Sequence, residues 1–199
     1  TNMPQSTVNI KRVSDIVAGL LALALLLVPM CIIGIAVKLD SKGPVIYRQR
    51  RIGYRRRPFD IFKFRTMRTD AEADGHPMLS AQHDMRVTRV GRVLRKYRLD
   101  ELPQFFNVVR GDMSIVGPRP EREYYIQQIV ERAPFYTLLH QVRPGITSWG
   151  MVKYGYATSV EEMIERMRYD LLYIENISFA VDMKIIMHTV VTVVSGKGL

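Results

Sequence analysis

The sequence predicts a mainly helical α/β domain that follows an N-terminal membrane helix. Three observations support this fold class. Residues 16–37 form a long run without charged side chains, residues 43–67 contain two strand-like stretches, and the segments after residue 87 repeat apolar side chains at helical spacing. We expect residues 1–42 to form the N-terminal segment with the membrane helix and residues 43–199 to form one compact domain.

Composition limits the class of protein and of partner. A chain of 199 residues is long enough for one domain with a real core. The formal charge of +10 predicts an anionic partner, which is a nucleic acid, an anionic membrane surface or a phosphorylated substrate. The single cysteine, Cys31, excludes an intrachain disulfide and favours a reducing compartment. No Cys or His spacing indicates a zinc site.

The first element is the apolar run, IVAGLLALALLLVPMCIIGIAV. As a helix it would extend about 30 Å, which matches the hydrocarbon thickness of a bilayer. Cationic residues flank it on both sides, so the positive-inside rule gives no crossing direction. Pro29 removes a backbone donor near its middle and is expected to kink or break the helix. A re-entrant helix that is broken at Pro29 and enters and leaves by one membrane face explains both features.

Three other interpretations of the apolar run are open. A straight spanning helix with a proline kink fits the hydropathy about equally well, because membrane helices tolerate proline. A buried core helix is less favoured, because apolar runs of this length are uncommon in soluble domains. A cleaved signal peptide would need a small-x-small cleavage site after the run, and the sequence contains none there.

The second element is a basic hairpin, GPVIYRQRRIGYRRRPFDIFKFRTM, with two strands joined around Gly53. Its six clustered arginines are Arg48, Arg50, Arg51, Arg55, Arg56 and Arg57. Most of them are expected to hold anionic lipid headgroups beside the membrane. Lys63 and Arg65 stand apart from this cluster and are candidates for a site. Residues 68–84 are rich in turn formers and predict a surface loop.

Two helices are predicted next. The first carries apolar side chains at positions 90, 93, 94 and 97. The second carries them at positions 102, 105, 106 and 109, accepts Pro103 in its first turn and ends at Gly111. This spacing places Asp100 and Glu101 at the N-terminal end of the second helix. A lone Asp at such a position usually caps free backbone N–H groups.

Positive charge near these acids favours a reactive site over a cap. The basic residues just before them are Arg92, Arg95, Lys96 and Arg98. A helix start also attracts anions such as phosphate. An ionised carboxylate, a second carboxylate able to hold a divalent cation and several arginines suit attack on a phosphoanhydride. Further along, Pro118 and Pro120 fix φ on both sides of Arg119, which lowers the entropic cost of presenting its guanidinium.

Four motifs then occur in a characteristic order: KFRTM at 63–67, LDELPQFFNVVRGDMSIVGPRPE at 99–121, VRPGITSWG at 142–150 and YDLLYIENIS at 169–178. Together they resemble the bacterial sugar transferase family, the monotopic polyprenyl-phosphate phosphoglycosyl transferases, over nearly the whole chain. The resemblance implies an α/β catalytic domain on the cytoplasmic face of the bacterial inner membrane. It also implies anchoring by a re-entrant helix that is broken at a proline, here Pro29.

For the chemistry, the resemblance implies transfer of a sugar 1-phosphate from a UDP-sugar to polyprenyl (undecaprenyl) phosphate, with release of UMP. Asp100 matches the family's nucleophile, which forms a covalent phosphosugar intermediate. Glu101 matches the second acid of the dyad, and the two acids are assigned to Mg²⁺. Arg95 and Arg119 match arginines that contact substrate phosphates or the nucleotide. The full set of predicted substrate-binding residues is Lys63, Arg65, Arg95, Pro118, Arg119, Pro120 and Asp182.

Two stretches depart from the family pattern. Val28 stands where small members often have a serine before the break proline, so the polar contact of a re-entrant turn must come from elsewhere. After Trp149 the chain reads MVKYGYA in place of an Asn-Gly-Arg stretch, so sugar recognition cannot be transferred. Lys153 or Tyr154 is either a substrate contact or a packing residue.

The tail predicts two more helices. One has an apolar stripe at positions 160, 164, 167, 171 and 174, and the other contains MKIIMHTVVTVV, which is too short to span a bilayer. For this last helix, packing in the core is our first interpretation and lying in the membrane interface is the second. The histidines share no ligand spacing and receive no role.

Non-enzymatic interpretations are also open: a polybasic membrane scaffold that binds anionic lipid, or a nucleic-acid module. Our prediction names a UDP-sugar, polyprenyl phosphate and inner-membrane lipids as partners, without nucleic acid, and it allows a homo-oligomer. The sugar is not readable from the sequence. Larger family members carry further segments before this region, and whether this chain is part of such a longer protein is not readable from the sequence either.

Overall fold

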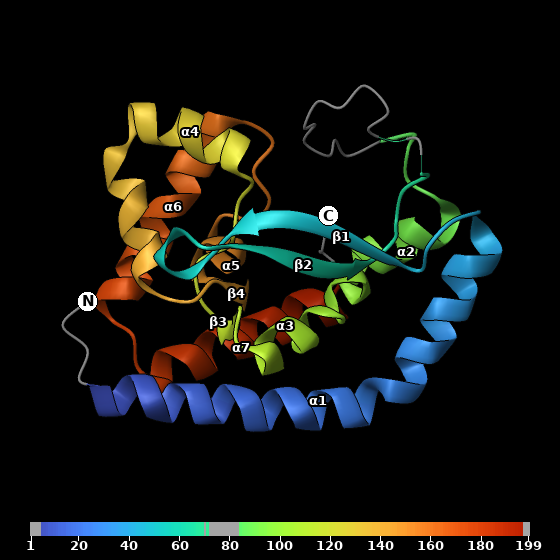
Figure 1. Cartoon of the computed structure of the whole chain (residues 1–199), viewed down its shortest axis with the longest axis horizontal. Helices are drawn as coiled ribbons and strands as arrows, with labels where there is room; N and C mark the ends of the chain where they lie inside the picture. The colour runs from blue at the N-terminus through green and yellow to red at the C-terminus, as the bar shows by residue number, and fades with distance from the viewer. Residues whose placement is uncertain (1–4, 70, 72–83, 197–199) are drawn as a thin grey trace.

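The computed structural model describes residues 5–69, 71 and 84–196. The predicted, mainly helical character is confirmed, and the strands found within these residues form two small sheets (Figure 1). The α-helices are α1 (Gln5–Asp40), α2 (Arg89–Lys96), α3 (Gln104–Arg110), α4 (Glu123–Arg132), α5 (Trp149–Lys153), α6 (Val160–Glu175) and α7 (Phe179–Val194). The strands are β1 (Ile46–Ile52), β2 (Pro58–Phe64), β3 (Ser114–Val116) and β4 (Gly145–Thr147). The described residues also form three 3-10 helices: η1 (Tyr54–Arg56), η2 (Leu99–Glu101) and η3 (Pro134–Gln141). Most of the predicted loop at 68–84 lies outside the described residues.

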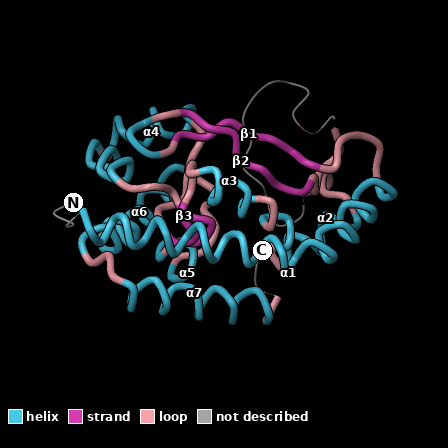
Figure 2. Tube along the Cα trace, turned by 60° about the horizontal axis from the view of Figure 1, so that its bottom comes forward, coloured by secondary structure: helices cyan, strands magenta, loops and turns pink. Residues whose placement is uncertain are grey.

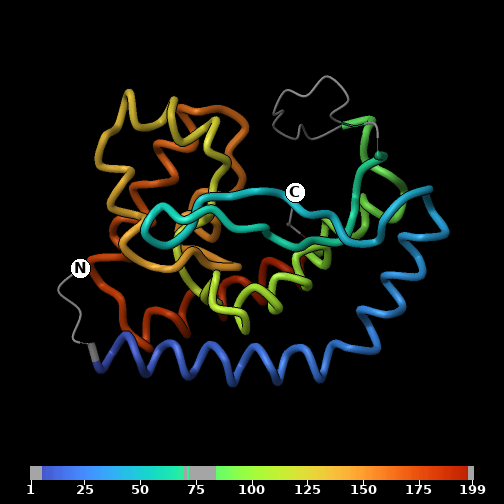
Figure 3. The backbone as a smooth tube through the Cα atoms, viewed as in Figure 1, coloured from blue at the N-terminus to red at the C-terminus, as the bar shows by residue number. Residues whose placement is uncertain are grey.

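Helix α1 contains the apolar run and lies along one edge of the molecule (Figure 1). Among the described helices it is the one long and apolar enough to cross a membrane by length and composition, with a mean hydropathy of 2.9. Large apolar side chains such as Leu25, Val28 and Ile35 are exposed on it. The helix is continuous through Pro29 and bends in its second half, where that proline lacks a donor (Figure 3). The re-entrant insertion and a break at Pro29 stay predictions.

Polar side chains dock the N-terminal half of α1 onto the domain. Arg12 donates to carbonyl oxygens at the C-terminal end of α3 at 2.7 and 3.0 Å, where a cation is favourable. Asp15 is buried and accepts from the Ser114 hydroxyl at 2.7 Å. Lys11 forms an ion pair with Asp182 at the start of α7. One face of α1 is therefore fixed to three separate elements.

The predicted hairpin around Gly53 is confirmed. Strands β1 and β2 pair antiparallel, from Ile46 opposite Phe64 to Ile52 opposite Pro58. The turn between them contains two arginines, at positions 55 and 56, with left-handed backbone at φ 54° and 59°. In Figure 1 the hairpin crosses the molecule from the α4–α6 side to α2. It thereby brings the end of β2 next to η2, and Phe64 at that end packs with Leu94 of α2.

A second, parallel sheet was not predicted from the sequence. Strand β3 pairs with β4, with Ser114 opposite Gly145 and Val116 opposite Thr147. The pairing continues beyond the strands, since the Gly145 N–H donates to the Pro118 carbonyl at 2.9 Å. This sheet fixes the start of the Pro118–Arg119–Pro120 segment.

The largest hydrophobic core lies between α4, α6, η3 and α7, and buries Ile126, Ile129, Met167 and Ile185. The predicted stripe of α6 is confirmed in part, because Met167 and Ile174 are buried.

Core packing is the wrong interpretation for most of the last helix, α7. Ile185 is its buried residue, while the apolar side chains at 179, 187, 191 and 194 are exposed. A helix that is apolar on several faces cannot bury all of them in one core. The start of α7 meets α1 at the Lys11–Asp182 ion pair, and Figure 2 shows α7 on the same side of the molecule as α1.

Candidate active site

Asp100 and Glu101 lie on η2, the short 3-10 turn between α2 and α3. The sequence places them at an α-helix start, but α3 begins only at Gln104. Pro103 explains the delay, because it has no N–H to donate to the turn before it. Neither η2 nor α3 has a side-chain cap hydrogen bond among the described residues, so capping does not account for the two acids. Both are buried, with 8% and 4% of their surface exposed.

Glu101 is held by cations from two other elements. The Lys63 ammonium, on β2, donates to Glu101 Oε1 at 2.8 Å. The Arg119 guanidinium approaches the same oxygen at 3.5 Å. Burial alone would raise the pKa of Glu101, but Lys63, Arg119 and Arg98 together hold that pKa below its usual value. Glu101 is therefore the stronger acid of the pair and stays ionised at any pH at which Asp100 is ionised.

Asp100 has the opposite shift. Burial raises the pKa of Asp100 to about 6, and the neighbouring Glu101 carboxylate adds to the rise, while Lys63 and Arg95 oppose it. The two adjacent acids thus have pKa values that are pushed apart, which is a pattern of paired carboxylates with different tasks. At neutral pH Asp100 still carries its charge most of the time. The charge state of Asp100 therefore depends on the balance between its burial and the nearby cations Lys63 and Arg95.

The Pro118–Arg119–Pro120 segment follows β3 and is fixed through its backbone. Gly145 donates to the Pro118 carbonyl at 2.9 Å, and the Arg119 N–H points to an Asp170 carboxylate oxygen at 3.5 Å. The arginine side chain remains available to face Glu101. The structure thereby brings Lys63 and Arg119 to the acidic pair, although they are far apart in the sequence.

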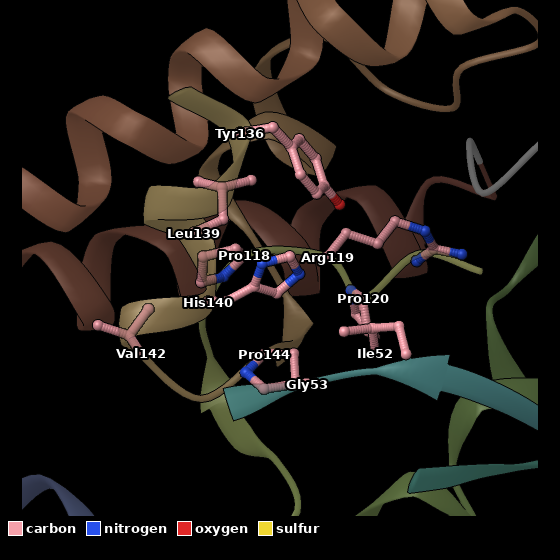
Figure 4. A pocket seen from close by; sticks show the side chains of 10 residues that line it. All are labelled: Ile52, Gly53, Pro118, Arg119, Pro120, Tyr136, Leu139, His140, Val142 and Pro144. Carbon is pink, nitrogen blue, oxygen red and sulfur yellow. The ribbon is translucent and has the colours of Figure 1, made fainter. Parts of the chain in front are cut away.

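A small cavity lies behind this segment (Figure 4). Its volume is about 10 Å³, the size of one water molecule. His140 lines it and, within the described part of the chain, its Nδ1 is buried without a hydrogen-bond partner. Figure 4 shows the Arg119 guanidinium pointing away from His140. The cavity is too small for a sugar or nucleotide. We therefore interpret His140 as a residue that packs behind the Pro118–Arg119–Pro120 segment. No feature of the sequence singles it out.

Arg65, a predicted substrate-binding residue, lies at the C-terminal end of α1. Its guanidinium donates to the carbonyls of Ser41 and Lys42, each at 2.6 Å, and to Val37 at 3.3 Å. Such contacts satisfy the last carbonyls of a helix. The geometry therefore assigns Arg65 a structural contact, and its role in substrate binding stays a prediction.

Two other predicted residues also have structural partners. Arg95 Nε donates to the Thr66 hydroxyl at 2.8 Å, while its charge still acts on Asp100. Asp182 accepts from the Tyr173 hydroxyl at 2.8 Å and pairs with Lys11. Asp182 thus joins α7 to α1 and α6, away from the hydrogen bonds of the acidic pair.

Sequence reasoning missed the acid that ends the GPRPE motif. Glu121 is buried and accepts from Arg51 at 2.9 Å and from Arg166 at 2.5 Å. These two arginines come from β1 and α6, so Glu121 ties the hairpin to the helical core immediately after Pro120. The sequence does contain a feature that could have indicated Glu121, namely its position as an acid directly after the rigid Pro118–Arg119–Pro120 segment.

The acidic pair is the group of residues that fits a divalent cation. The described residues contain no cluster of three or more His, Cys, Asp or Glu side chains suited to a metal. Mg²⁺ does not need one, because it is commonly bound through one or two carboxylates and completed by substrate phosphates and water. Two adjacent carboxylates are compatible with this kind of site, and magnesium at Asp100 and Glu101 stays a prediction.

The chain matches known proteins over nearly its whole length. The family described as "Bacterial sugar transferase" matches residues 6–196. A UDP-N-acetylgalactosamine-undecaprenyl-phosphate N-acetylgalactosaminephosphotransferase of Aeromonas hydrophila is 44% identical over 189 residues, which are 95% of this chain and 44% of that protein. A UDP-glucose:undecaprenyl-phosphate glucose-1-phosphate transferase of Escherichia coli K12 is 44% identical, covering 94% of this chain and 41% of that protein. One of Caulobacter vibrioides with the same description is 43% identical, covering 94% and 71%. The chain spans less than half the length of the first two relatives.

Proposed function

Because the chain belongs to the bacterial sugar transferase family, we propose that it transfers a sugar 1-phosphate from a UDP-sugar to polyprenyl phosphate. Undecaprenyl phosphate is the carrier in the names of its relatives. The observation that carries the proposal is the buried Asp100–Glu101 pair, whose pKa values are pushed apart beside Lys63 and Arg119. The relatives are named for different sugars, N-acetylgalactosamine and glucose, so the sugar is left open.

In the first step Asp100 is the nucleophile. A carboxylate oxygen attacks the sugar-bearing phosphorus of the UDP-sugar, the bridging phosphoanhydride bond breaks, and UMP leaves with the bonding electrons. The sugar phosphate is then covalently attached to Asp100. With a pKa of about 6, Asp100 is largely ionised at neutral pH, so this attack needs no separate base.

In the second step an oxygen of polyprenyl phosphate attacks the same phosphorus and displaces Asp100. The products are polyprenyl-diphosphate-sugar and the free carboxylate. Lys63 and Arg119 would stabilise charge on the phosphate oxygens, and ionised Glu101 holds both of them in place. Magnesium bound at Asp100 and Glu101 would further neutralise the diphosphate.

Both halves of α1 contact the same domain, which favours a re-entrant anchor. Near its start, Arg12 and Asp15 bind α3 and β3. Near its end, Val37 is buried against Phe64 and Leu94. A straight spanning helix would have to give up one set of these contacts. We place the domain on the cytoplasmic face of the inner membrane, with the exposed apolar side chains of α1 in lipid.

The covalent step is tested with Asp100→Asn, which keeps the size of the side chain. The purified protein is mixed with a UDP-sugar and Mg²⁺ without lipid acceptor, and its intact mass is measured. The parent should gain the mass of one sugar phosphate, mapped to Asp100, while the variant gains none. The turnover of Asp100→Asn should fall at least ~10³-fold, which corresponds to a rise of about 4 kcal/mol in the activation barrier.

Asp112→Asn is the matched control, because Asp112 is an acid paired with Arg110 outside the buried pair. It should form the adduct as the parent does. An adduct that persists in Asp100→Asn, or that maps to another residue in the parent, would overturn the mechanism. Absence of UMP release with every UDP-sugar, together with intact binding to anionic vesicles, would favour the polybasic scaffold.

A further inference from the structure

Tyr156 lies between two arginines of the candidate site. Its ring centroid is 5.3 Å from the guanidinium carbon of Arg119 and 5.0 Å from that of Arg98. Both cations also act on Glu101 and help to lower its pKa. Guanidiniums are attracted to the faces of aromatic rings, so one ring can hold two cations that would otherwise repel each other. Tyr156 therefore joins the two arginines beside the acidic pair.

Arg98 depends on such a contact. Its backbone is left-handed, with φ 53°, an uncommon conformation for a residue other than glycine and one that often marks a functional site. Its side chain is buried, and among the described residues its Nε has no hydrogen-bond partner. The ring of Tyr156 is therefore a principal contact of this guanidinium.

Arg119 also needs a contact that fixes its side chain. The prolines on either side restrict its backbone but leave its long side chain free to rotate. Its contact with Glu101 is 3.5 Å long, at the limit for a hydrogen bond. The stacked ring is thus well suited to select the rotamer that faces Glu101.

The loop that carries Tyr156 is built to turn the ring inward. Gly155 has φ +96°, and a Cβ added there would meet no atom within 4 Å. The glycine is therefore needed for its backbone conformation and not for space. Burial raises the pKa of Tyr156 to about 12, so the phenol is neutral at physiological pH and the ring itself makes the contact.

From these contacts we infer that Tyr156 is a positioning residue, which holds the Arg119 guanidinium toward the diphosphate of the substrate. The inference rests on the proposed function for the identity of that diphosphate. It assigns a task to the MVKYGYA stretch, where this chain departs from the family pattern. The ring is the acting group, and the hydroxyl is dispensable.

The test compares Tyr156→Leu, which removes the ring, with Tyr156→Phe, which removes only the hydroxyl. Tyr54→Leu is the matched control, because the Tyr54 ring also lies against two guanidiniums, those of Arg55 and Arg143, at 5.1 and 5.3 Å. The 199-residue chain is purified in detergent. Affinity for UDP is measured by calorimetry, UMP release by steady-state kinetics, and folding by thermal unfolding.

Tyr156→Leu should weaken UDP binding and lower kcat/KM for the UDP-sugar by about tenfold each. Tyr156→Phe and Tyr54→Leu should both stay within about twofold of the parent, since both keep the Tyr156 ring. The inference is overturned if Tyr156→Leu binds UDP like the parent, or if Tyr54→Leu loses as much. It is also overturned if Tyr156→Phe fails to restore the loss, because the hydroxyl would then be the acting group. A parent that binds UDP without releasing UMP would instead refute the proposed function, and the UDP affinities would still decide the role of Tyr156.

Discussion

Removing the charge of Lys63 should shift the pH dependence of the enzyme. Lys63 is partly buried, lies 2.8 Å from Glu101 and is the largest charge that opposes the rise in the pKa of Asp100. Lys63→Met keeps the length of the side chain and its apolar stem. A nearby opposite charge lowers a carboxyl pKa by about 1–3 units, so its loss should raise that of Asp100 by at least about one unit.

The direction follows from the need for an ionised nucleophile. With a pKa of about 6, Asp100 loses its charge as the pH falls through 6, and activity should fall with it. At pH 7 about nine-tenths of the parent's Asp100 would be ionised, against about half or less in Lys63→Met. The acid limb of the variant therefore lies at higher pH, and its activity should recover as the pH is raised.

The assay is kcat/KM for the UDP-sugar between pH 5 and 9 at one fixed Mg²⁺ concentration. Lys184→Met is the control, because Lys184 is an exposed lysine on α7 that stacks on Trp149. It should leave the acid limb unchanged. An acid limb that stays in place or moves to lower pH in Lys63→Met would refute the proposed electrostatic balance at the pair.

Two other predictions concern stability and topology. Glu121→Gln removes the charge that pairs the buried Arg166 with Arg51, and should cost about 3–5 kcal/mol, seen as a lower thermal unfolding temperature; an unchanged temperature would contradict this. For the re-entrant anchor, cysteines placed at Asn9 and at Lys42, after replacement of the native cysteine, should both react with an impermeant thiol reagent from the cytoplasmic side only. Opposite accessibility of the two positions would exclude it.

Local patterns predicted much of the fold. The turn at Gly53 and the end of α3 at Gly111, where φ is 105°, follow from residues that lie within or next to those elements. The same holds for α6, whose buried Met167 and Ile174 belong to a helical stripe. These features need only short-range information, because a period or a glycine is visible in the sequence itself.

Other features depend on contacts that no local pattern contains. Strands β3 and β4 have three residues each, too few for an alternation, and they pair across about thirty residues. The 3-10 turn at Asp100 follows from Pro103 together with the packing of β2. The motif around Arg65 predicts a substrate-binding residue. Its contacts with carbonyl oxygens become visible only when the end of α1 is placed next to it in the fold. The juxtaposition of Lys63, Glu101 and Arg119 likewise depends on tertiary folding.

The docking of α1 has a practical consequence for preparing the protein. A soluble version that starts after residue 42 would lose the Asp15 carboxylate that holds Ser114, and with it a support of the strand that leads into Arg119. It would also lose Val37, which covers Phe64 in the core. Helix α1 therefore also forms part of the packed surface of the domain. Solubility would be better sought by replacing outward-facing leucines such as Leu25 with polar residues than by deleting the helix.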